Sequence, residues 1–206
     1  AKYSDDSLAR VATIGEPGII HQPALAVAGN DQLMIVWSQV NTNNVMELHA
    51  QAVQNGEPVG SPTTLAASED GGNVLARAAT DRAGRVWVAW QAFRGGPSDI
   101  FCRHFDPSSS NWSVEVRVTD DAAGDWEPCI AFDNKDGAWV VYDSARGNEF
   151  SVYANRVSLD GSVSDTKTLI RTERYEGRVT SVGTPNGDGI WLTCERGNEQ
   201  WGLDMR

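Results

Sequence analysis

Short apolar segments recur along the chain at a nearly constant interval. Four of them share one pattern, an apolar stretch that ends in a polar residue, and they occupy residues 33–38, 86–91, 138–143 and 190–195. Their second positions, Met34, Trp87, Trp139 and Trp191, are 53, 52 and 52 residues apart. Unrelated strands would rarely show such regular spacing, so the pattern indicates an internal repeat.

Each repeat contains further strands around this segment. Another apolar stretch precedes it, and the connector between the two is rich in Gly, Asn and Asp, the residues that tight hairpins require. A third strand follows, with clear apolar and polar alternation in residues 151–157. A fourth strand is expected at residues 62–66, 113–119 and 163–170. Four hairpin-linked strands per repeat predict an all-β fold, a β-propeller of four four-stranded antiparallel blades.

The four repeats fill the chain as a single β-propeller domain over residues 1–206. We expect blades near residues 17–67, 70–120, 122–172 and 173–206, the last completed by residues 7–15. The last repeat stops after its third strand, and residues 8–14 resemble the missing fourth strand. An N-terminal strand that closes the ring would remove exposed sheet edges. The alternative is a fragment of a larger propeller.

Composition and charge narrow the choice of partners. The chain carries 17 Lys and Arg against 28 Asp and Glu, a formal charge of -11, which repels nucleic acid and anionic membrane surfaces. The three cysteines, Cys102, Cys129 and Cys194, are far apart, so we expect no metal, no cofactor and at most one disulfide. Eight Trp, 20 Gly and few Lys are typical of bacterial exported β-proteins, which predicts a secreted or periplasmic location.

Propellers bind ligands near the central axis, where the innermost strands converge. Alignment of the repeats places six candidate ligand-binding residues there, of which Trp126 would offer a stacking face to a sugar. Arginines beside a carboxylate would suit a sugar or an acidic small molecule. The alternative is a water-filled channel whose charged groups satisfy one another. The six residues are His21, Gln22, Arg77, Trp126, Glu127 and Arg178. The alignment places His21, Trp126 and Arg178 at one equivalent position of the repeat, and Gln22 and Glu127 at the next.

An enzyme would need more than this channel. Glycoside hydrolysis uses two carboxylates across the scissile bond, and if the protein is an enzyme, we expect Glu127 and Arg77 to be catalytic. Asp125 and Glu176 are the candidates for the second carboxylate. No Gly-x-Ser-x-Gly motif accompanies the three histidines, which argues against a serine hydrolase.

One blade motif carries a family resemblance. Residues 79–90, with the sequence ATDRAGRVWVAW, resemble the sialidase-like and TolB-like blades of bacterial exported propellers. The likeness implies the architecture and leaves the activity open, because propellers include lectins, hydrolases, lyases and scaffolds. None of the four hairpin turns has the Ser and Gly spacing of the sialidase Asp-box, which weakens a sialidase assignment.

Two functions follow as hypotheses. The first is a noncatalytic binding or scaffold module for a glycan, a small molecule or a protein partner, which could also position a neighbouring domain of a longer parent protein. The alternative is a carbohydrate-active hydrolase or lyase with its site at the mouth of the central channel.

Overall fold

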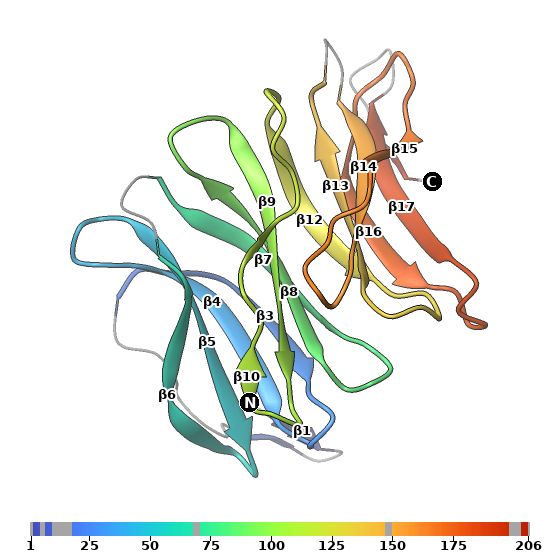
Figure 1. The fold of residues 1–206 in the computed structure, drawn as a ribbon. Helices are drawn as coiled ribbons and strands as arrows, with labels where there is room; N and C mark the ends of the chain where they lie inside the picture. Colours follow the sequence, from blue (N-terminus) through green and yellow to red (C-terminus); the bar gives the residue numbers. More distant parts are fainter. Residues whose placement is uncertain are drawn as a thin grey trace.

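A computed structural model describes residues 2–4, 7–9, 18–67, 71–146, 150–197 and 203–205. Every regular element in this part of the chain is a β-strand, and none of it forms a helix long and apolar enough to cross a membrane. Four antiparallel sheets stand side by side in chain order, from the N-terminal blade to the C-terminal blade (Figure 1). The protein is therefore a β-propeller of four blades, as the repeat predicts.

Consecutive strands build each blade from the innermost strand outward. The first blade contains β3 (Ile20–Val27), β4 (Leu33–Val40), β5 (Met46–Gln54) and β6 (Glu57–Ala66). The second contains β7 (Asn73–Thr80), β8 (Val86–Phe93), β9 (Ser98–Asp106) and β10 (Asn111–Trp112), and β11 (Val116–Arg117) also pairs with β9. The third contains β12 (Asp125–Ala131), β13 (Ala138–Ser144), β14 (Ser151–Val157) and β15 (Lys167–Ile170). The fourth contains β16 (Glu176–Gly183), β17 (Ile190–Gly197) and β18 (Leu203–Met205).

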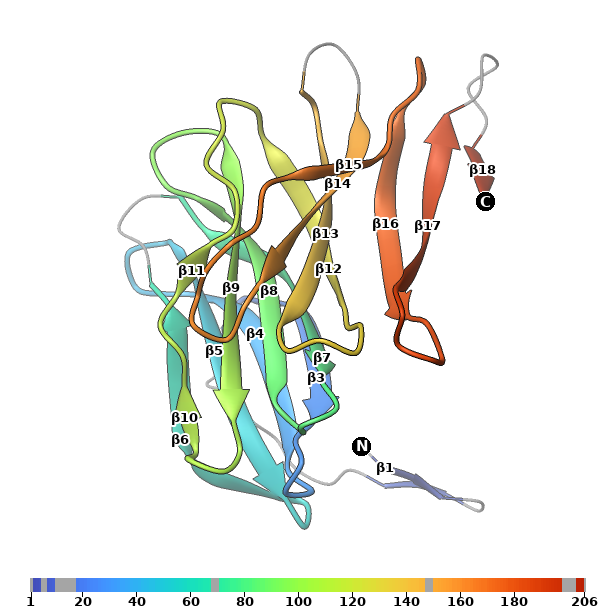
Figure 2. The ribbon, with the colours of Figure 1, turned by 45° about the vertical axis from the view of Figure 1, so that its right-hand side comes forward.

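The N-terminal segment pairs differently from the expectation. β1 (Lys2–Ser4) and β2 (Ser7–Ala9) form a separate hairpin, which projects away from the blades (Figure 2). The described part of the expected closing strand therefore pairs with its own neighbour along the chain. Residues 10–17 lie outside the described part of the chain, so closure of the ring by this segment stays a prediction.

The same side-chain contact fixes the first hairpins of the second and third blades. The Asp81 carboxylate accepts the indole N–H of Trp87 at 3.0 Å, and Asp133 accepts that of Trp139 at the same distance. Each aspartate also accepts a backbone N–H two residues further on, as Asx turns do. These hairpins therefore hold the first two strands of each blade in register.

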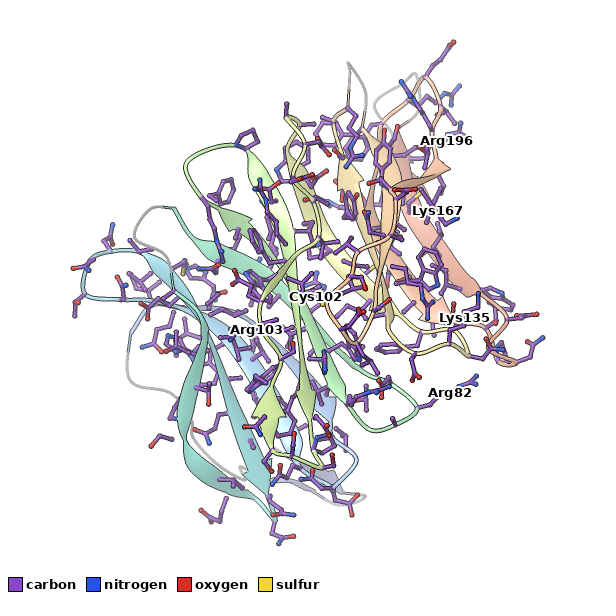
Figure 3. All side chains as sticks on the ribbon, in the orientation of Figure 1. Arg82, Cys102, Arg103, Lys135, Lys167 and Arg196 are labelled. Carbon is purple, nitrogen blue, oxygen red and sulfur yellow. The ribbon has the colours of Figure 1, made fainter. Side chains whose placement is uncertain are left out.

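Apolar side chains between neighbouring blades form the core. One repeat position contributes a buried residue from every blade, at Trp37, Trp90, Tyr142 and Cys194. Three successive clusters fill the spaces between the first and second, second and third, and third and fourth blades. The three cysteines are free and buried, and Cys102 lies in the interior, whereas Arg82 and Lys135 lie at the periphery (Figure 3).

The two end blades expose faces that are buried in the middle blades. Trp87 is 1% exposed because the third blade covers it, and its ring centroid lies 6.4 Å from that of Phe132. The equivalent Trp191 of the fourth blade is 64% exposed. On the opposite face, Ile130 is 7% exposed, whereas the equivalent Leu25 of the first blade is 64% exposed. Within the described residues, the first and last blades each lack a neighbour on one side.

Candidate functional site

The innermost strands β3, β7, β12 and β16 lie side by side, since β3 contacts β7, β7 contacts β12, and β12 contacts β16. The pairing of each with its second strand shifts register at one equivalent bulge. Each bulge holds a non-glycine residue with positive φ, a conformation that such residues rarely adopt and that is enriched at functional sites. The four residues are Gln22 (46°), Leu75 (55°), Glu127 (48°) and Arg178 (50°).

The bulges correct the alignment made from sequence spacing. That alignment placed Arg178 level with Trp126, whereas the structure places Gly177 there. Trp126 pairs with Asp143, and Gly177 pairs with Glu195 at the same point of the fourth blade. The bulges of β12 and β16 are one residue closer together along the chain than equivalent positions of the second strands, β13 and β17. Arg178 is therefore the equivalent of Glu127.

An axial hollow of about 510 Å³ lies between the second, third and fourth blades. Three of the six predicted residues line it, Arg77 from β7, Glu127 from β12 and Arg178 from β16. The Arg178 guanidinium Nη1 lies 3.5 Å from Glu195 Oε2. The remaining lining residues are small or apolar and come from the same three strands: Ala78, Ala79, Cys129, Ile130, Val179, Thr180 and Ser181.

The other three predicted residues lie outside this lining. His21 is exposed and pairs with Ser38 in the first blade. Gln22 uses its side-chain Oε1 to accept the backbone N–H of Leu75 at 2.9 Å, which ties the first blade to the second. The Trp126 ring packs against Phe150, with centroids 5.2 Å apart.

Asp143 is a functional candidate that the sequence reasoning missed. It lies one residue before the end of β13, is 3% exposed, and its carboxylate accepts the backbone N–H of Arg178. Its Oδ1 has no hydrogen-bond partner within the described residues. Burial, and then the charge of Glu127, raise the pKa of Asp143 to about 7. Asp143 and Glu127 therefore form an interacting pair of carboxyl groups, of which Glu127 lines the hollow and Asp143 is buried.

Gly177 makes room for this pair. A Cβ at that position would lie 2.5 Å from the Tyr175 hydroxyl oxygen and 3.1 Å from Asp143 Oδ2. Burial, followed by the charges of Asp143 and Glu127, raises the pKa of Tyr175. A larger residue at Gly177 would therefore separate the Tyr175 hydroxyl from the carboxyl groups.

Tyr175 also ends a row of aromatic rings beside the carboxyl pair. Its ring lies 5.2 Å from that of Phe150, which in turn packs on Trp126. Tyr175 is 36% exposed, so its ring offers a partly accessible apolar surface next to the site. Aromatic rings of this kind pack against the apolar faces of sugar rings.

Asp125 and Glu176, the candidates for a second carboxylate, are held in ion pairs behind the site. They are 0% and 1% exposed. Arg146 Nη2 lies 3.4 Å from Asp125 Oδ1, and Arg196 Nε lies 3.4 Å from Glu176 Oε1. None of Asp125, Glu176 and Asp143 lines the axial hollow, but Asp143 is the carboxyl group whose pKa is raised by the charge of Glu127, so we take Asp143 as its partner.

No cluster of three His, Cys, Asp or Glu side chains within the described ranges is arranged to hold a metal ion. The polar groups of the hollow are the Glu127 carboxylate, two guanidinium groups and the hydroxyls of Thr180 and Ser181. The arrangement can bind a polar ligand and can transfer protons through the carboxyl pair.

Comparisons with known proteins agree on the fold. No protein-family model matches the sequence, and no curated protein resembles it significantly. A solved thermostable family-43 glycoside hydrolase matches 91% of this chain and 74% of its own, with 10% identity and a TM-score of 0.56. The fold is that of a β-propeller.

Two further structures show the same likeness. A Penicillium chrysogenum α-L-arabinanase complexed with arabinobiose is 13% identical over 90% of this chain, with a TM-score of 0.62. An α-L-arabinofuranosidase from Fusarium graminearum in complex with an iminosugar inhibitor is 11% identical over 91%, with a TM-score of 0.56. The chain spans less than two thirds of the length of both enzymes, 63% and 65%.

These structures correct the functional expectation. We expected first a noncatalytic binding or scaffold module, and this was wrong, because the similar structures are mostly glycoside hydrolases and favour the hydrolase alternative. The propeller architecture expected from the blade motif is confirmed.

Proposed function

We propose that this protein is a carbohydrate-active hydrolase whose site is the axial hollow at the mouth of the central channel. The observation that carries the proposal is the pair formed by Asp143 and Glu127. The two carboxyl groups interact, but Asp143 is buried whereas Glu127 lines the hollow. Two carboxyl groups in unequal environments are the arrangement that separates acid and base roles in glycosidases.

The different environments of the two carboxyl groups give each of them a different role. Because the pKa of Asp143 is raised to about 7, it keeps its proton well above the pH at which an ordinary aspartate loses it. Asp143 is the protonated member, which supplies the proton for the glycosidic oxygen. Glu127 lines the hollow and is the member that activates water or stabilises the positive charge that develops on the sugar. Because the charge of Glu127 contributes to the raised pKa of Asp143, replacement of Glu127 also changes the proton donor.

Other groups of the site bind the sugar. Arg77 and Arg178 bring guanidinium donors to the hollow, and Tyr175 offers a partly exposed ring beside the carboxyl pair. The similar arabinanase was solved with arabinobiose. Arabino-oligosaccharides are therefore the first substrates to test, and a glycan substrate fits the secreted or periplasmic location expected from composition.

The test is a hydrolysis screen with matched variants. Purified protein is incubated with arabino-, xylo-, manno- and galacturono-oligosaccharides, and new reducing ends are quantified. We expect the release of sugar from at least one substrate and losses of about 100-fold or more in Glu127→Gln and Asp143→Asn. Glu57→Gln changes an exposed glutamate outside the hollow and serves as the control. Absence of hydrolysis across the screen, or full activity in Glu127→Gln, would overturn the proposal.

A further inference from the structure

We infer that Arg77 makes the axial hollow selective for a glycan that carries a carboxylate, such as an oligouronide. The inference rests on the proposed site and names the chemical class of its ligand. It is carried by the position of Arg77 in the repeat, by its lack of an acidic partner and by the shape of the lining around it.

Arg77 occupies a repeat position at which the other blades have small side chains. It is the first residue after the bulge of β7 to pair with the second strand. The equivalent residues are Ala24, Cys129 and Thr180. Cys129 and Thr180 line the hollow together with Arg77. Arg77 is thus the one long, charged side chain at this level of the four innermost strands, and its neighbours leave it space.

The Arg77 guanidinium has no carboxylate partner within the described part of the chain. Its Nη1 donates to the backbone carbonyl of the adjacent Ala76 at 3.3 Å, and the side chain is exposed. Several other arginines of the fold have acidic partners. Arg94 binds both oxygens of Glu115, at 2.5 and 2.8 Å, and Arg178 faces Glu195. Arg77 therefore keeps its donors available to a ligand.

A guanidinium group with free donors in a concave site suits a carboxylate. The planar fork of arginine matches the two oxygens of a carboxylate and binds them with charge-assisted hydrogen bonds. A neutral sugar would satisfy these donors through hydroxyl groups alone, without the charge. The Glu127 carboxylate lies in the same lining and can accept hydrogen bonds from sugar hydroxyls. A sugar acid uses both kinds of group at once.

The net negative charge of the chain favours a short ligand over a long polyanion. At a formal charge of -11, the protein repels a long polyanion, so the attraction by Arg77 is local. We therefore expect short oligouronides to bind better, per sugar unit, than long polyuronates.

Binding of galacturonate and of its methyl ester tests the inference. The two monosaccharides differ by the charge on one group, and neither contains a glycosidic bond to hydrolyse. Affinities are measured by NMR titration for the unmodified protein, for Arg77→Gln and for Arg171→Gln, an exposed arginine outside the hollow. We expect the unmodified protein to prefer the acid by about 10-fold, the scale of one charge-assisted contact.

The variants separate the possible results. Arg77→Gln is expected to remove the preference for the acid and to leave the affinity for the ester unchanged, whereas Arg171→Gln is expected to keep the preference. Equal binding of acid and ester, binding of neither, or a preference that survives in Arg77→Gln would overturn the inference. Preference for the acid without hydrolysis of any oligosaccharide would overturn the proposed enzymatic function alone, because this titration needs no turnover.

Discussion

The backbone N–H of Arg178 donates a hydrogen bond to the carboxylate of Asp143 across the boundary between the third and fourth blades. The preceding boundary repeats the contact, since Glu127 donates its backbone N–H to Gln91 Oε1 at 3.4 Å. Gln91 and Asp143 hold the same position at the end of their second strands. Asp143 thus does two things: it secures the bulge that presents Arg178, and it interacts with the charge of Glu127.

Asp143 should make stability depend on pH in a specific direction. Its pKa is about 7 in the folded protein, against about 4 in an unfolded chain. Between these values the folded state holds one more proton than the unfolded state, so the free energy of unfolding falls as the pH rises from about 4 to 7. In Asp143→Asn the residue no longer titrates, so we expect the free energy of unfolding to fall less over this pH range than in the unmodified protein. The difference is at most about 4 kcal/mol. Urea unfolding from pH 4 to 8 measures the difference.

A matched control makes this result interpretable. Asp165→Asn changes an exposed aspartate and should reproduce the pH dependence of the unmodified protein. Parallel curves for Asp143→Asn and the unmodified protein would contradict the assignment of a raised pKa to Asp143.

Trp90 is expected to be a main support of the interface between the first two blades. It is 0% exposed, and its indole N–H donates to Asn73 Oδ1 at 3.0 Å. Trp90→Ala would leave a cavity and an unpaired buried amide oxygen, so we expect a loss of about 3 to 5 kcal/mol in unfolding free energy. Trp191→Ala, at an exposed position, should change it by less than about 1 kcal/mol. An unchanged melting temperature in Trp90→Ala would refute this role.

Arg146 is expected to stabilise the fold by pairing with buried acid. It lies 3.4 Å from Asp125 Oδ1 and also pairs with Asp121. Arg146→Met would leave Asp125 buried without a cation, which costs about 3 to 5 kcal/mol when an ion pair is broken on one side. Arg94→Met removes a more exposed pair with Glu115 and should cost about 1 kcal/mol or less. Thermal unfolding that ranks the two variants in the reverse order would contradict this account.

The exposed end faces should make the chain self-associate. Leu25 and Trp191 are each 64% exposed, whereas the equivalent Ile130 and Trp87 of the middle blades are 7% and 1% exposed. Apolar faces of this kind favour association in water. Sedimentation velocity should therefore show a mass that rises with concentration, and the double variant Leu25→Ser, Trp191→Ser should reduce it. A monomer of 22.3 kDa at every concentration would show that these faces do not associate.

The fold could be predicted from the sequence because the patterns that determine it are local and recur in each blade. The 52-residue spacing and the hairpin turns locate the strands of the blades without any long-range contact. The same spacing brought Arg77, Glu127 and Arg178 to the axis. It misplaced Arg178 by one residue, because the register shift inside the bulge depends on pairing with β17.

Asp143 could not be recognised in the same way. At the end of an apolar strand it has the pattern of a solvent-facing residue. Its burial comes from the next blade, where Gly177 allows the chain to pass within contact distance of the carboxylate. Such burial depends on residues more than 30 positions away, which strand periodicity does not report.

The pH profile of kcat/KM for hydrolysis of an oligosaccharide tests the central claim most directly, because it reports the protonation of Asp143 in the free enzyme. We predict that the rate of the unmodified protein falls above pH of about 7, where Asp143 loses its proton, and that Glu127→Gln is about 100-fold slower or more at every pH. Hydrolysis that stays constant up to pH 9, or that is as fast in Glu127→Gln as in the unmodified protein, would contradict the account.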